Sequence, residues 1–510
     1  MTQNEALAIM HSGQSILLTG AAGAGKTYTL NSFIRSCRAN GKNIAVTATT
    51  GLAATHLNGS TIHSWAGIGI HDELPKNHFT KMSKQRHDQI NKADVLIIDE
   101  VSMLHDFRLD MVDNTCRTVR GVDKPFGGIQ VVLSGDFFQL PPVNRDDAFQ
   151  GGFVTNSKVW NDNFFTICYL SEQHRQKDDQ EYTEILNGIR AGFLSGRQIT
   201  ILKDKKLNDI SGKTATRLLT TNANVDTINK NHLDEIETES FEYTMATSGS
   251  KKYVEQLLRS CLASEILELK IGAQVMFIKN SQDKKYVNGT LGKVVGFELE
   301  TSYPIVQLNS GKQITVKPDT WELVDGDIRR ASTVQIPLRL AWAITVHKSQ
   351  GMTLDAAQID LSNAFVEGMG YVALSRVKNM NNLKLDGLNR MALQVSKVAK
   401  EIDANLREKS QEALVKNKKI IKQWAKDETK RKSEPKLTIK KSAVTWSDKL
   451  SKMRKEYPNA YMPWKEEEDR KLVGEFSKNK TIPELSKMLG RHKGSIKARL
   501  EKYFGEDSFD

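Results

Sequence analysis

The chain has 510 residues, of which 39% are hydrophobic and 26% are charged, and its formal net charge is +12. This composition excludes a wholly disordered chain and predicts two to four globular domains, each long enough to bury a core. No apolar run approaches the roughly 20 residues of a membrane helix, and the N-terminus lacks the basic and apolar segments of a secretory signal. The four cysteines are far apart with no CxxC pair, which excludes a disulfide scaffold and a cysteine-rich metal site.

The positive charge is concentrated toward one end of the chain. Residues 401–510 carry 28 Lys and Arg against 19 Asp and Glu, a net charge of +9, whereas residues 1–400 carry 45 against 42, a net charge of +3. A basic tail on a balanced body indicates a polyanionic partner such as nucleic acid, although a solubilising tail has the same composition. Without a targeting segment we expect the protein in a bacterial cytoplasm or a phage-infected cell, associated with the nucleoid.

Short apolar runs alternate with helical stretches along the first 170 residues. The runs are continuous rather than alternating, which is typical of strands buried in a parallel sheet with helices on both faces. This pattern predicts an α/β fold. The expected strands are at residues 15–19, 43–47, 95–98 and 129–134.

The second half of the chain contains two kinds of strand. Residues 216–220 and 356–361 are expected to form a second parallel sheet. Between them, about residues 245–335 carry short strands separated by Gly, Asn and Asp turns, which predicts a small inserted β-barrel with Gly289 and Gly292 in its turns. The expected barrel strands are at residues 268–279, 290–298, 303–308 and 313–316.

The last part of the chain is predicted to be helical. Residues 399–426 are expected to form a helix, and the Lys-rich, Pro-containing residues 430–441 are expected to form a linker. A compact helical segment then follows at about residues 460–505. The chain has no internal repeat of fixed period.

A phosphate-binding loop, or P-loop, follows the first expected strand. The segment Gly20-Ala-Ala-Gly-Ala-Gly-Lys-Thr27 matches G-x-x-x-x-G-K-[ST] between a strand and a helix. Glycines let the backbone wrap around phosphates, and the amides and the helix N-terminus point at the anion. Lys26 reaches the β- and γ-phosphates, and the Thr27 hydroxyl is a ligand for Mg²⁺. The candidate nucleotide-binding residues of this segment are Gly20, Gly23, Gly25, Lys26, Thr27 and Tyr28.

Two acidic residues end the expected strand at residues 95–98. In a P-loop protein, Asp99 is placed to hold Mg²⁺ with Thr27, and Glu100 is placed to polarise the attacking water. These features together predict an NTPase that hydrolyses its nucleotide.

Three further motifs narrow the class of NTPase. Residues 126–143 form a strand and a Pro-terminated loop, which places Asp136 and Gln139 where a γ-phosphate is sensed. Residues 345–351 have the sequence Thr-Val-His-Lys-Ser-Gln-Gly, and residues 371–376 have the sequence Tyr-Val-Ala-Leu-Ser-Arg. With these motifs, about residues 1–400 resemble superfamily 1B DNA helicases, in particular the petite-integration-frequency (Pif) family, relatives of RecD and of the phage Dda helicase. Residues 106–128 are similar to the segment that separates this family from its relatives.

The resemblance implies a motor that binds ATP and Mg²⁺ between two RecA-like domains and moves 5′ to 3′ on single-stranded DNA. The implied partners are single-stranded DNA and single-strand/duplex junctions, bound by a monomer. DNA repair, recombination and telomere maintenance are the cellular processes that the resemblance suggests. The implied domains are a first RecA-like domain at 1–170 with a small insertion at about 69–92, a second at 171–245 and 336–400, the inserted barrel at 246–335, a helix and basic linker at 401–455, and a helical domain at 456–510.

The resemblance also implies roles for residues outside the P-loop. Gln3 corresponds to the glutamine that contacts adenine. Arg175, in Leu-Ser-Glu-Gln-His-Arg-Gln, and Arg376 correspond to the two arginines that reach the γ-phosphate across the cleft. The implied catalytic residues are Lys26, Asp99, Glu100, Gln139, Arg175 and Arg376.

Four segments resemble the family's DNA-contacting motifs, two in each RecA-like domain. Their hydroxyls and amides suit contacts with the DNA backbone, which position the strand without specifying its sequence. His63 and Trp65 are expected to contact or stack on bases. The candidate DNA-binding residues are Thr47, Thr49, His63, Trp65, Thr220, Asn222, His347, Lys348 and Ser349.

The C-terminal segment resembles a Myb/SANT-like three-helix fold with a helix–turn–helix. Its last helix offers Arg491, Lys493, Lys497 and Arg499 for contact with duplex DNA, and a protein-binding module is the alternative. The expected core residues are Trp464, Leu472, Phe476, Leu485, Leu489, Ile496 and Leu500.

Three other interpretations of the whole chain stay open. The same motor motifs serve a DNA-stimulated ATPase that remodels protein–DNA complexes without separating strands. A motor that prefers RNA differs only in its contacts around the 2′-position. An ATPase of the AAA+ type is disfavoured by the motifs at residues 126–143 and 371–376 and by the β-rich insertion.

Overall fold

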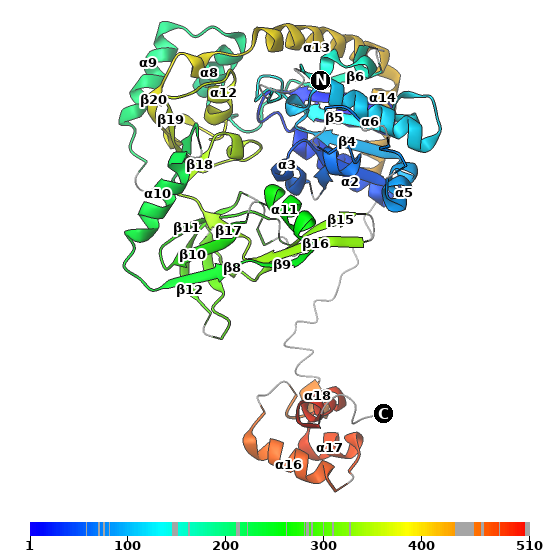
Figure 1. Ribbon diagram of the computed structural model, residues 1–510, viewed down its shortest axis with the longest axis vertical. Coiled ribbons are helices and arrows are strands. Elements are labelled where there is room, and N and C mark those ends of the chain that lie inside the picture. Colours follow the sequence, from blue (N-terminus) through cyan, green and yellow to red (C-terminus); the bar gives the residue numbers. More distant parts are fainter. Residues whose placement is uncertain are drawn as a thin grey trace. The chain divides into compact units, whose positions relative to one another are not determined.

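The computed structural model of the protein consists of two compact units, Met1–Asp427 and Glu428–Asp510 (Figure 1). None of the described helices has the length and apolar character needed to cross a membrane. The structure describes all residues except 58, 70–71, 75–76, 81, 145–150, 162–163, 211–214, 222, 262, 280, 282–284, 287–288, 299, 309–310, 326–327, 434–452, 461–463, 479 and 505–510.

A six-stranded parallel sheet forms the core of the first RecA-like fold, in the order β3-β2-β4-β5-β1-β6. Its three central strands are buried along their whole length, as their runs of Ile, Leu and Val require. The four strands predicted for this region are confirmed to within one residue. The strands are β1 (Ile16–Gly20), β2 (Ile44–Ala48), β3 (Ser60–Thr61), β4 (Val95–Asp99), β5 (Gln130–Gly135) and β6 (Thr166–Leu170).

Helices surround this sheet (Figure 1). The first of them begins at Gln3 because Thr2 and Glu5 form a capping box, in which the Thr2 hydroxyl accepts from the Glu5 amide and the Glu5 carboxylate accepts from the Thr2 amide. That cap fixes where Gln3 lies. The helices are α1 (Gln3–His11), α2 (Lys26–Ala39), α3 (Gly51–His56), α4 (Ile62–Trp65), α5 (Lys84–Lys92), α6 (Asp106–Arg120) and α7 (Lys158–Asn161).

A four-stranded parallel sheet forms the second RecA-like fold, in the order β18-β7-β19-β20. The predicted strands at 216–220 and 356–361 are present as β7 and β19, and the two outer strands escaped prediction. Its elements are β7 (Ala215–Leu219), β18 (Ala343–Thr345), β19 (Ala356–Leu361), β20 (Leu383–Leu388), α8 (Gln180–Ala191), α9 (Gly196–Asp204), α10 (Ala223–Asp234) and α12 (Met369–Leu374).

A β-rich region lies between α10 and β18 along the chain. Its described strands form sheets of five, three and two strands, so closure into one barrel stays a prediction. The predicted single strand at 268–279 is wrong, because Gly272, at φ +102°, turns the chain between β10 and β11. The elements are β8 (Ser240–Thr244), β9 (Ala246–Gly249), α11 (Lys251–Ser260), β10 (Ile266–Lys270), β11 (Gln274–Phe277), β12 (Leu291–Phe297), β13 (Pro304–Leu308), β14 (Gln313–Thr315), β15 (Asp319–Asp325), β16 (Ile328–Gln335) and β17 (Leu338–Leu340).

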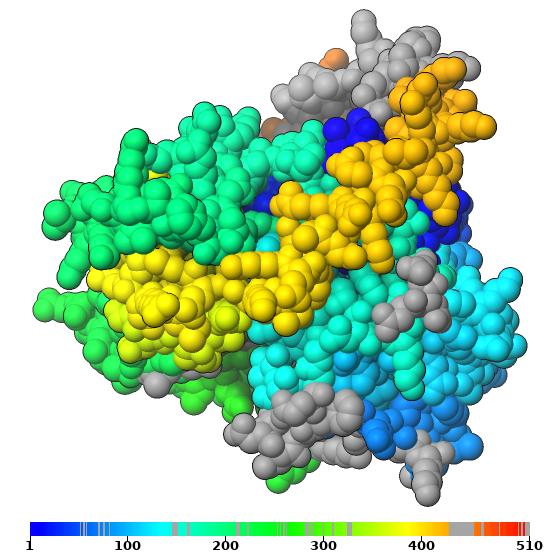
Figure 2. All heavy atoms as spheres, turned by 90° about the horizontal axis from the view of Figure 1, so that it is seen from above, coloured from blue at the N-terminus to red at the C-terminus, as the bar shows by residue number. Residues whose placement is uncertain are grey.

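Two helices, α13 (Lys397–Lys416) and α14 (Lys418–Ser433), follow the second fold. The prediction of one helix over 399–426 is wrong, because the helix breaks at Asn417. Figure 2 shows α13 (yellow to orange) running along the surface from the second fold toward the dark blue N-terminal part. There the indole of Trp424 stacks on His11 of α1, with 4.7 Å between ring centroids. The two helices therefore tie the end of the second fold to the first.

The second unit contains α16 (Glu466–Phe476), α17 (Ile482–Leu489) and α18 (Lys493–Phe504). All seven residues predicted for its core pack together in one cluster. A capping box of Thr481 and Glu484 starts α17, and Gly490, at φ +59°, ends it.

Most of the predicted linker at 430–441 lies outside the described residues, and residues 430–433 continue α14. Short 3-10 turns complete the chain at Val101–Met103, Pro125–Gly128, Val154–Asn156, Lys205–Leu207, His347–Ser349, Met380–Asn382 and Met391–Leu393.

Candidate active site

A cavity of about 420 Å³ lies beside the P-loop, and its walls come from both RecA-like folds. The second fold contributes Gly351, Thr353 and Lys378 in addition to the predicted arginine. Ten predicted nucleotide and catalytic residues line this cavity: Gly23, Gly25, Lys26, Thr27, Tyr28, Asp99, Glu100, Gln139, Arg175 and Arg376.

The P-loop has the backbone that its glycines allow. Gly23 and Gly25 both have φ +88°, and a Cβ at Gly25 would lie 2.0 Å from Nε2 of Gln3. That amide also donates to the carbonyl of Ala24 at 3.4 Å. The glutamine predicted to contact adenine therefore packs against the P-loop, and Gly20 joins the loop to β1.

Lys26 is folded back onto its own loop. Its Nζ donates to the carbonyls of Gly20 at 2.8 Å and Ala21 at 3.1 Å. Burial lowers the pKa of Lys26, while the nearby carboxylates of Asp136 and Glu100 act in the opposite direction. The ammonium group is thus held at the place where phosphate oxygens meet a P-loop.

The acidic pair occupies the end of β4 as predicted. Burial raises the pKa of Asp99. The pKa of Glu100 is raised to about 7 by burial first and by the charge of Asp99 second. Glu100 also has φ +53°, an uncommon conformation for a non-glycine residue that is often found at functional sites. A carboxylate with a pKa near neutrality is suited to accept a proton from water.

The cavity also contains the groups that a magnesium ion requires. The Thr27 hydroxyl and the Asp99 carboxylate both line it, and they are hard oxygen donors of the kind that Mg²⁺ prefers. Mg²⁺ usually takes only one or two protein ligands and completes its shell with water and phosphate oxygens. The two residues therefore fit the predicted cofactor.

The two predicted arginines differ in how they are held. Nη1 of Arg175 donates to the carbonyl of Ser375 at 2.8 Å. Arg376 is 1% exposed and donates to the carbonyls of Val372, Ser349 and Met352 and to the Ser375 hydroxyl. These bonds use four of the five N–H groups of its guanidinium. Burial, aided by the charge of Arg175, lowers the pKa of Arg376 to about 9.

The segment that carries Arg175 lies directly on the P-loop. The amide of His174 donates to the carbonyl of Gly23 at 3.0 Å, and the side chain of Gln173 donates to the carbonyl of Ala22 at 3.0 Å. Because Arg175 also bonds Ser375 of the second fold, it lies at the seam between the two folds.

Two contacts across the cleft were not predicted from the sequence. Gln350 of the second fold donates to the Glu100 carboxylate at 3.0 Å, and only its place in a known motif marked it in the sequence. The second contact corrects the prediction for Asp136, which does not line the cavity. Its carboxylate accepts two bonds from Nη1 of Arg190, at 2.7 and 2.9 Å. Arg190 gave no signal in the sequence because a single arginine on a helix is most often exposed.

Sequence and fold comparisons identify the family of this site. Residues 3–197 match the model of the PIF1-like helicase family, and residues 252–297 match the model of the DNA helicase Pif1 2B domain. The chain is 43% identical to the ATP-dependent DNA helicase Pif1 of Psychrobacter sp. (strain PRwf-1), over 81% of this chain and 72% of that protein. The chain belongs to the Pif1-like helicase family. It is 36% identical to the Homo sapiens Pif1 protein over 75% of this chain and 60% of the human protein.

Solved Pif1 structures match the fold as well. The crystal structure of Pif1 helicase from Candida albicans has a TM-score of 0.70 and 35% identity, covering 79% of this chain and 98% of that one. Bacteroides Pif1 bound to single-stranded DNA has a TM-score of 0.61 and 33% identity, covering 81% and 97%. These matches confirm the predicted α/β architecture with RecA-like domains.

Four of the residues predicted from the Pif1 resemblance to contact DNA point into the protein. Thr47 donates its hydroxyl to the carbonyl of Ile97 at 2.6 Å, and Ser349 donates to Val346 at 2.7 Å, both with no exposed surface. Thr49 donates to the carbonyl of Glu100 at 2.9 Å. Trp65 is 8% exposed and packs in the main core. The three hydroxyls bond within the protein and the indole packs in the core, so in this structure none of these side chains faces a DNA strand, and their contact with DNA stays a prediction.

The remaining predicted DNA contacts have different surroundings. His63 is half-buried, and its pKa is lowered to about 4 by burial first and by Arg108 and His105 next, so it is neutral at pH 7. Thr220 is buried, and Asn222 lies outside the described residues.

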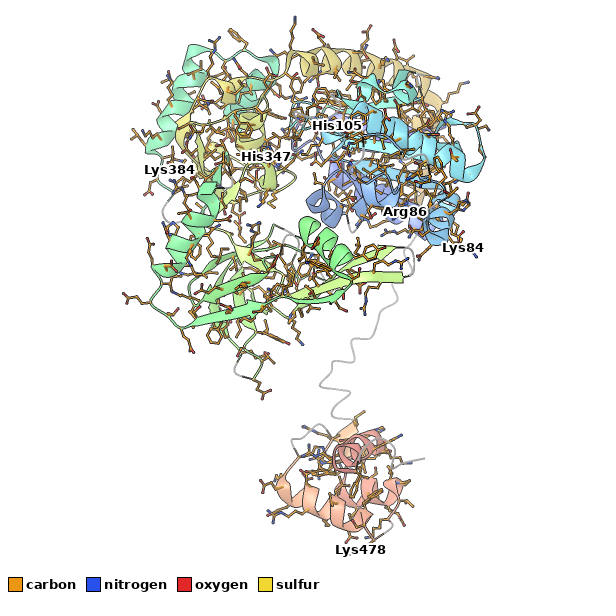
Figure 3. All side chains as sticks on the ribbon, in the orientation of Figure 1. Lys84, Arg86, His105, His347, Lys384 and Lys478 are labelled. Atoms are coloured by element: carbon orange, nitrogen blue, oxygen red, sulfur yellow. The ribbon has the colours of Figure 1, made fainter. Side chains whose placement is uncertain are left out.

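His347 and Lys348 are half-buried on the second fold, where Figure 3 labels His347. The ring of Phe365 lies 6.2 Å from that of His347, nearly parallel to it, and is 60% exposed. Sequence motifs gave no sign of Phe365.

The predicted basic residues of the C-terminal unit also divide into two kinds. Arg491 is 2% exposed, pairs with Glu468 at 2.8 Å and lies over the ring of Trp464. Arg499 pairs with Asp469. These arginines join the helices to one another, which corrects their assignment to DNA. Lys493 and Lys497 of α18 are exposed, as are Lys487 of α17 and His492 between the helices.

Proposed function

We propose that this chain uses ATP hydrolysis to move 5′ to 3′ along single-stranded DNA and to separate duplex strands. The activity of an ATP-dependent DNA helicase is that of its named relatives. One observation carries the proposal: a single cavity contains the P-loop lysine and acidic pair of one RecA-like fold and an arginine of the other. A site divided in this way responds to nucleotide by changing the arrangement of the two folds.

The residues of the cavity have distinct tasks in hydrolysis. Lys26 and the P-loop amides bind the β- and γ-phosphates. Glu100 orients the attacking water and accepts its proton, and Gln350 holds that carboxylate from the second fold. Mg²⁺, when held by Thr27 and Asp99, neutralises charge on the phosphates. Arg175 and Arg376 add positive charge on the other side of the γ-phosphate.

Movement on DNA requires a grip on each fold that changes as the cleft opens and closes. On the second fold we assign this grip to Lys348, for the DNA backbone, and to the exposed ring of Phe365 beside His347, for base stacking. On the first fold we assign it to backbone amides of the 45–54 segment and to neutral His63, since the Thr47 and Thr49 hydroxyls bond within the protein.

The C-terminal unit is proposed to bind duplex DNA through Lys487, Lys493 and Lys497. These side chains are exposed on α17 and α18, the two helices predicted to form the helix–turn–helix. We propose that the whole chain acts as a monomer at single-strand/duplex junctions.

The proposal is tested by ATP-dependent unwinding of one duplex that carries either a 5′ or a 3′ single-stranded DNA tail. We expect unwinding of the 5′-tailed substrate alone, with Lys26→Ala as the inactive control. Unwinding of the 3′-tailed substrate would contradict the direction. DNA-stimulated hydrolysis without any unwinding would instead favour a motor that remodels protein–DNA complexes.

A further inference from the structure

The hydroxyl of Tyr371 lies where the two RecA-like folds and the P-loop meet. It accepts from the amide of Ala22 in the P-loop at 2.9 Å and from Nη1 of Arg190 at 3.0 Å. It donates to the Asp136 carboxylate at 3.2 Å. A tyrosine hydroxyl has one donor and two acceptor positions, so these three bonds saturate it.

The four residues of this cluster, Tyr371 and its three partners, come from different parts of the motor. Ala22 and Asp136 belong to the first fold, in the P-loop and directly after β5, whereas Tyr371 lies on α12 and Arg190 on the last turn of α8, both of the second fold. The Arg190–Asp136 pair is almost completely buried, with side chains 6% and 1% exposed. Removing one partner of such a buried ion pair strongly destabilises the protein, because the other charge is left buried and unpaired. It therefore joins the folds as long as both charges are in place.

Asp136 and Arg190 both stay ionised near neutral pH. Burial acts to raise the pKa of Asp136, but Arg190 and Lys26 outweigh it and the pKa is lowered. Burial acts to lower the pKa of Arg190, but Asp136 and the surrounding tyrosines and Asp403 raise it well above its ordinary value. The guanidinium also lies over the ring of Phe138, 4.2 Å from its centroid.

The same arginine also reaches α13. Its Nη2 donates to the Asp403 carboxylate at 3.1 Å and to the Tyr169 hydroxyl at 2.9 Å. That second hydroxyl is saturated too, because it accepts from Arg407 and donates to Asp403. Arg190 thus connects the P-loop side of the cleft to the helix that runs along both folds.

We propose that Tyr371 is a positioning residue for nucleotide binding, whose hydroxyl, held by Asp136 and Arg190, fixes the P-loop amide of Ala22 and ties the second fold to the phosphate site of the first. The proposal rests on the proposed function only in that the P-loop binds ATP. Losing the hydroxyl leaves a buried P-loop amide without its acceptor and removes one partner of Arg190. The loop then loses the conformation in which its amides face phosphates.

The experiment compares Tyr371→Phe with Tyr182→Phe in the full chain. Tyr182 is a matched control, because it is also fully buried and its hydroxyl donates to the carbonyl of Leu374, which joins α8 to α12 within the second fold. We expect Tyr371→Phe to weaken the binding of a fluorescent ADP about tenfold, the effect of one lost buried hydrogen bond. We expect Tyr182→Phe to bind ADP like the wild type, even where its melting temperature falls further.

Two outcomes would overturn the proposal. One is ADP affinity in Tyr371→Phe equal to or above that of the wild type. The other is an equal loss of affinity in both variants, which would give the hydroxyl a merely structural role. The unwinding assay on the wild type is a separate readout: a chain that binds ADP but never unwinds DNA contradicts the proposed function and leaves the ADP comparison valid.

A second comparison separates the two ends of the cluster. Arg190 contacts Asp136 and Tyr371 through Nη1 and Asp403 through Nη2. Arg190→Lys keeps the charge but puts a single nitrogen in place of these two, so we expect it to weaken ADP binding as Tyr371→Phe does. Asp403→Asn removes only the negative charge that faces Arg190 from α13, and we expect ADP affinity within about twofold of the wild type. A larger loss in Asp403→Asn than in Arg190→Lys would contradict this assignment.

Discussion

The nucleotide cleft and the predicted DNA surface were both identified from motifs of one family, but the predicted side chains of the two regions lie in different surroundings. Ten predicted residues of the cleft line one cavity. Of the predicted DNA contacts, four side chains are turned into the sheets and the core. A P-loop acts through backbone geometry that only its glycines permit, so its sequence determines its shape. A threonine in a DNA motif can donate to a phosphate or to its own sheet, and the sequence is the same for both.

The largest effect is expected in the part where prediction and structure agree. Lys26→Ala should reduce DNA-stimulated ATP hydrolysis by about 10²–10³-fold, because it removes the positive charge at the phosphates. Steady-state hydrolysis at saturating DNA measures this. Lys92→Ala, at an exposed position at the end of α5, is the control and should hydrolyse ATP like the wild type. Retained turnover in Lys26→Ala would remove the P-loop from the mechanism.

Variants of Arg376 and Arg175 test whether an arginine of the cleft also stabilises the fold. Arg376→Ala should reduce hydrolysis about 10²-fold and also lower stability by roughly 1–3 kcal/mol, since buried carbonyls lose their donor. Arg175→Ala should reduce hydrolysis at a smaller cost in stability, because Arg175 makes a single bond to Ser375 across the seam. Hydrolysis and urea unfolding of both variants give the two quantities. Equal losses of hydrolysis and nucleotide binding in Arg376→Ala would indicate a structural arginine only.

Glu100 gives the cleft a pH dependence. The Glu100 carboxylate must be ionised to accept a proton from the attacking water. Its pKa is about 7 in the folded protein, so kcat/KM for ATP should fall as the pH drops through 7. Its folded pKa is above the ordinary value of 4.5, so the folded state binds the proton more tightly than the unfolded chain. Ionisation of Glu100 therefore lowers stability progressively as the pH rises from 4.5 to about 7.

The variant Glu100→Gln separates these two effects. It should abolish hydrolysis and yet raise stability at pH 8 on the order of 1 kcal/mol, with little change at pH 4.5. Chemical unfolding at both pH values measures the difference. A loss of stability at pH 8 would show that the ionised carboxylate is well accommodated in the fold.

The fold was predictable where a local sequence pattern fits only one kind of element. The buried strands ending at Gly20 and Asp99 were located to within one residue, because their apolar runs fit only a covered parallel strand. The outer strands β18 and β20, and the break at Asn417, gave no comparable signal. The Asp136–Arg190–Tyr371 cluster depends on three segments far apart in the sequence, and no local pattern predicts such a meeting.

A smaller effect is expected on the DNA side, where the two regions can be compared directly. Lys348→Ala should weaken binding to single-stranded DNA several-fold and lower the slope of log K against log salt by about 0.7, the loss of one phosphate contact. Thr47→Val should leave both quantities unchanged and instead cost about 1 kcal/mol of stability, because its hydroxyl bonds Ile97. DNA binding across a salt series measures the difference. Weakened DNA binding in Thr47→Val would restore its predicted role.

The smallest effect is expected in the C-terminal unit, where Lys493 and Arg491 show the same contrast between an exposed and a buried side chain. Lys493→Ala should weaken duplex DNA binding by the full chain a few-fold, with a smaller salt slope and an unchanged melting temperature, because the side chain is exposed. Arg491→Ala should lower the stability of the unit, because the guanidinium pairs with Glu468 and lies over Trp464. Arg491→Lys, which keeps the charge, should restore this stability only in part. At low temperature, where both variants remain folded, we expect Arg491→Lys and Arg491→Ala to bind duplex DNA equally. Equal binding would mean that the arginine affects DNA binding only by stabilising the fold. Stronger duplex binding in Arg491→Lys than in Arg491→Ala under those conditions would mean that its charge reaches DNA after all.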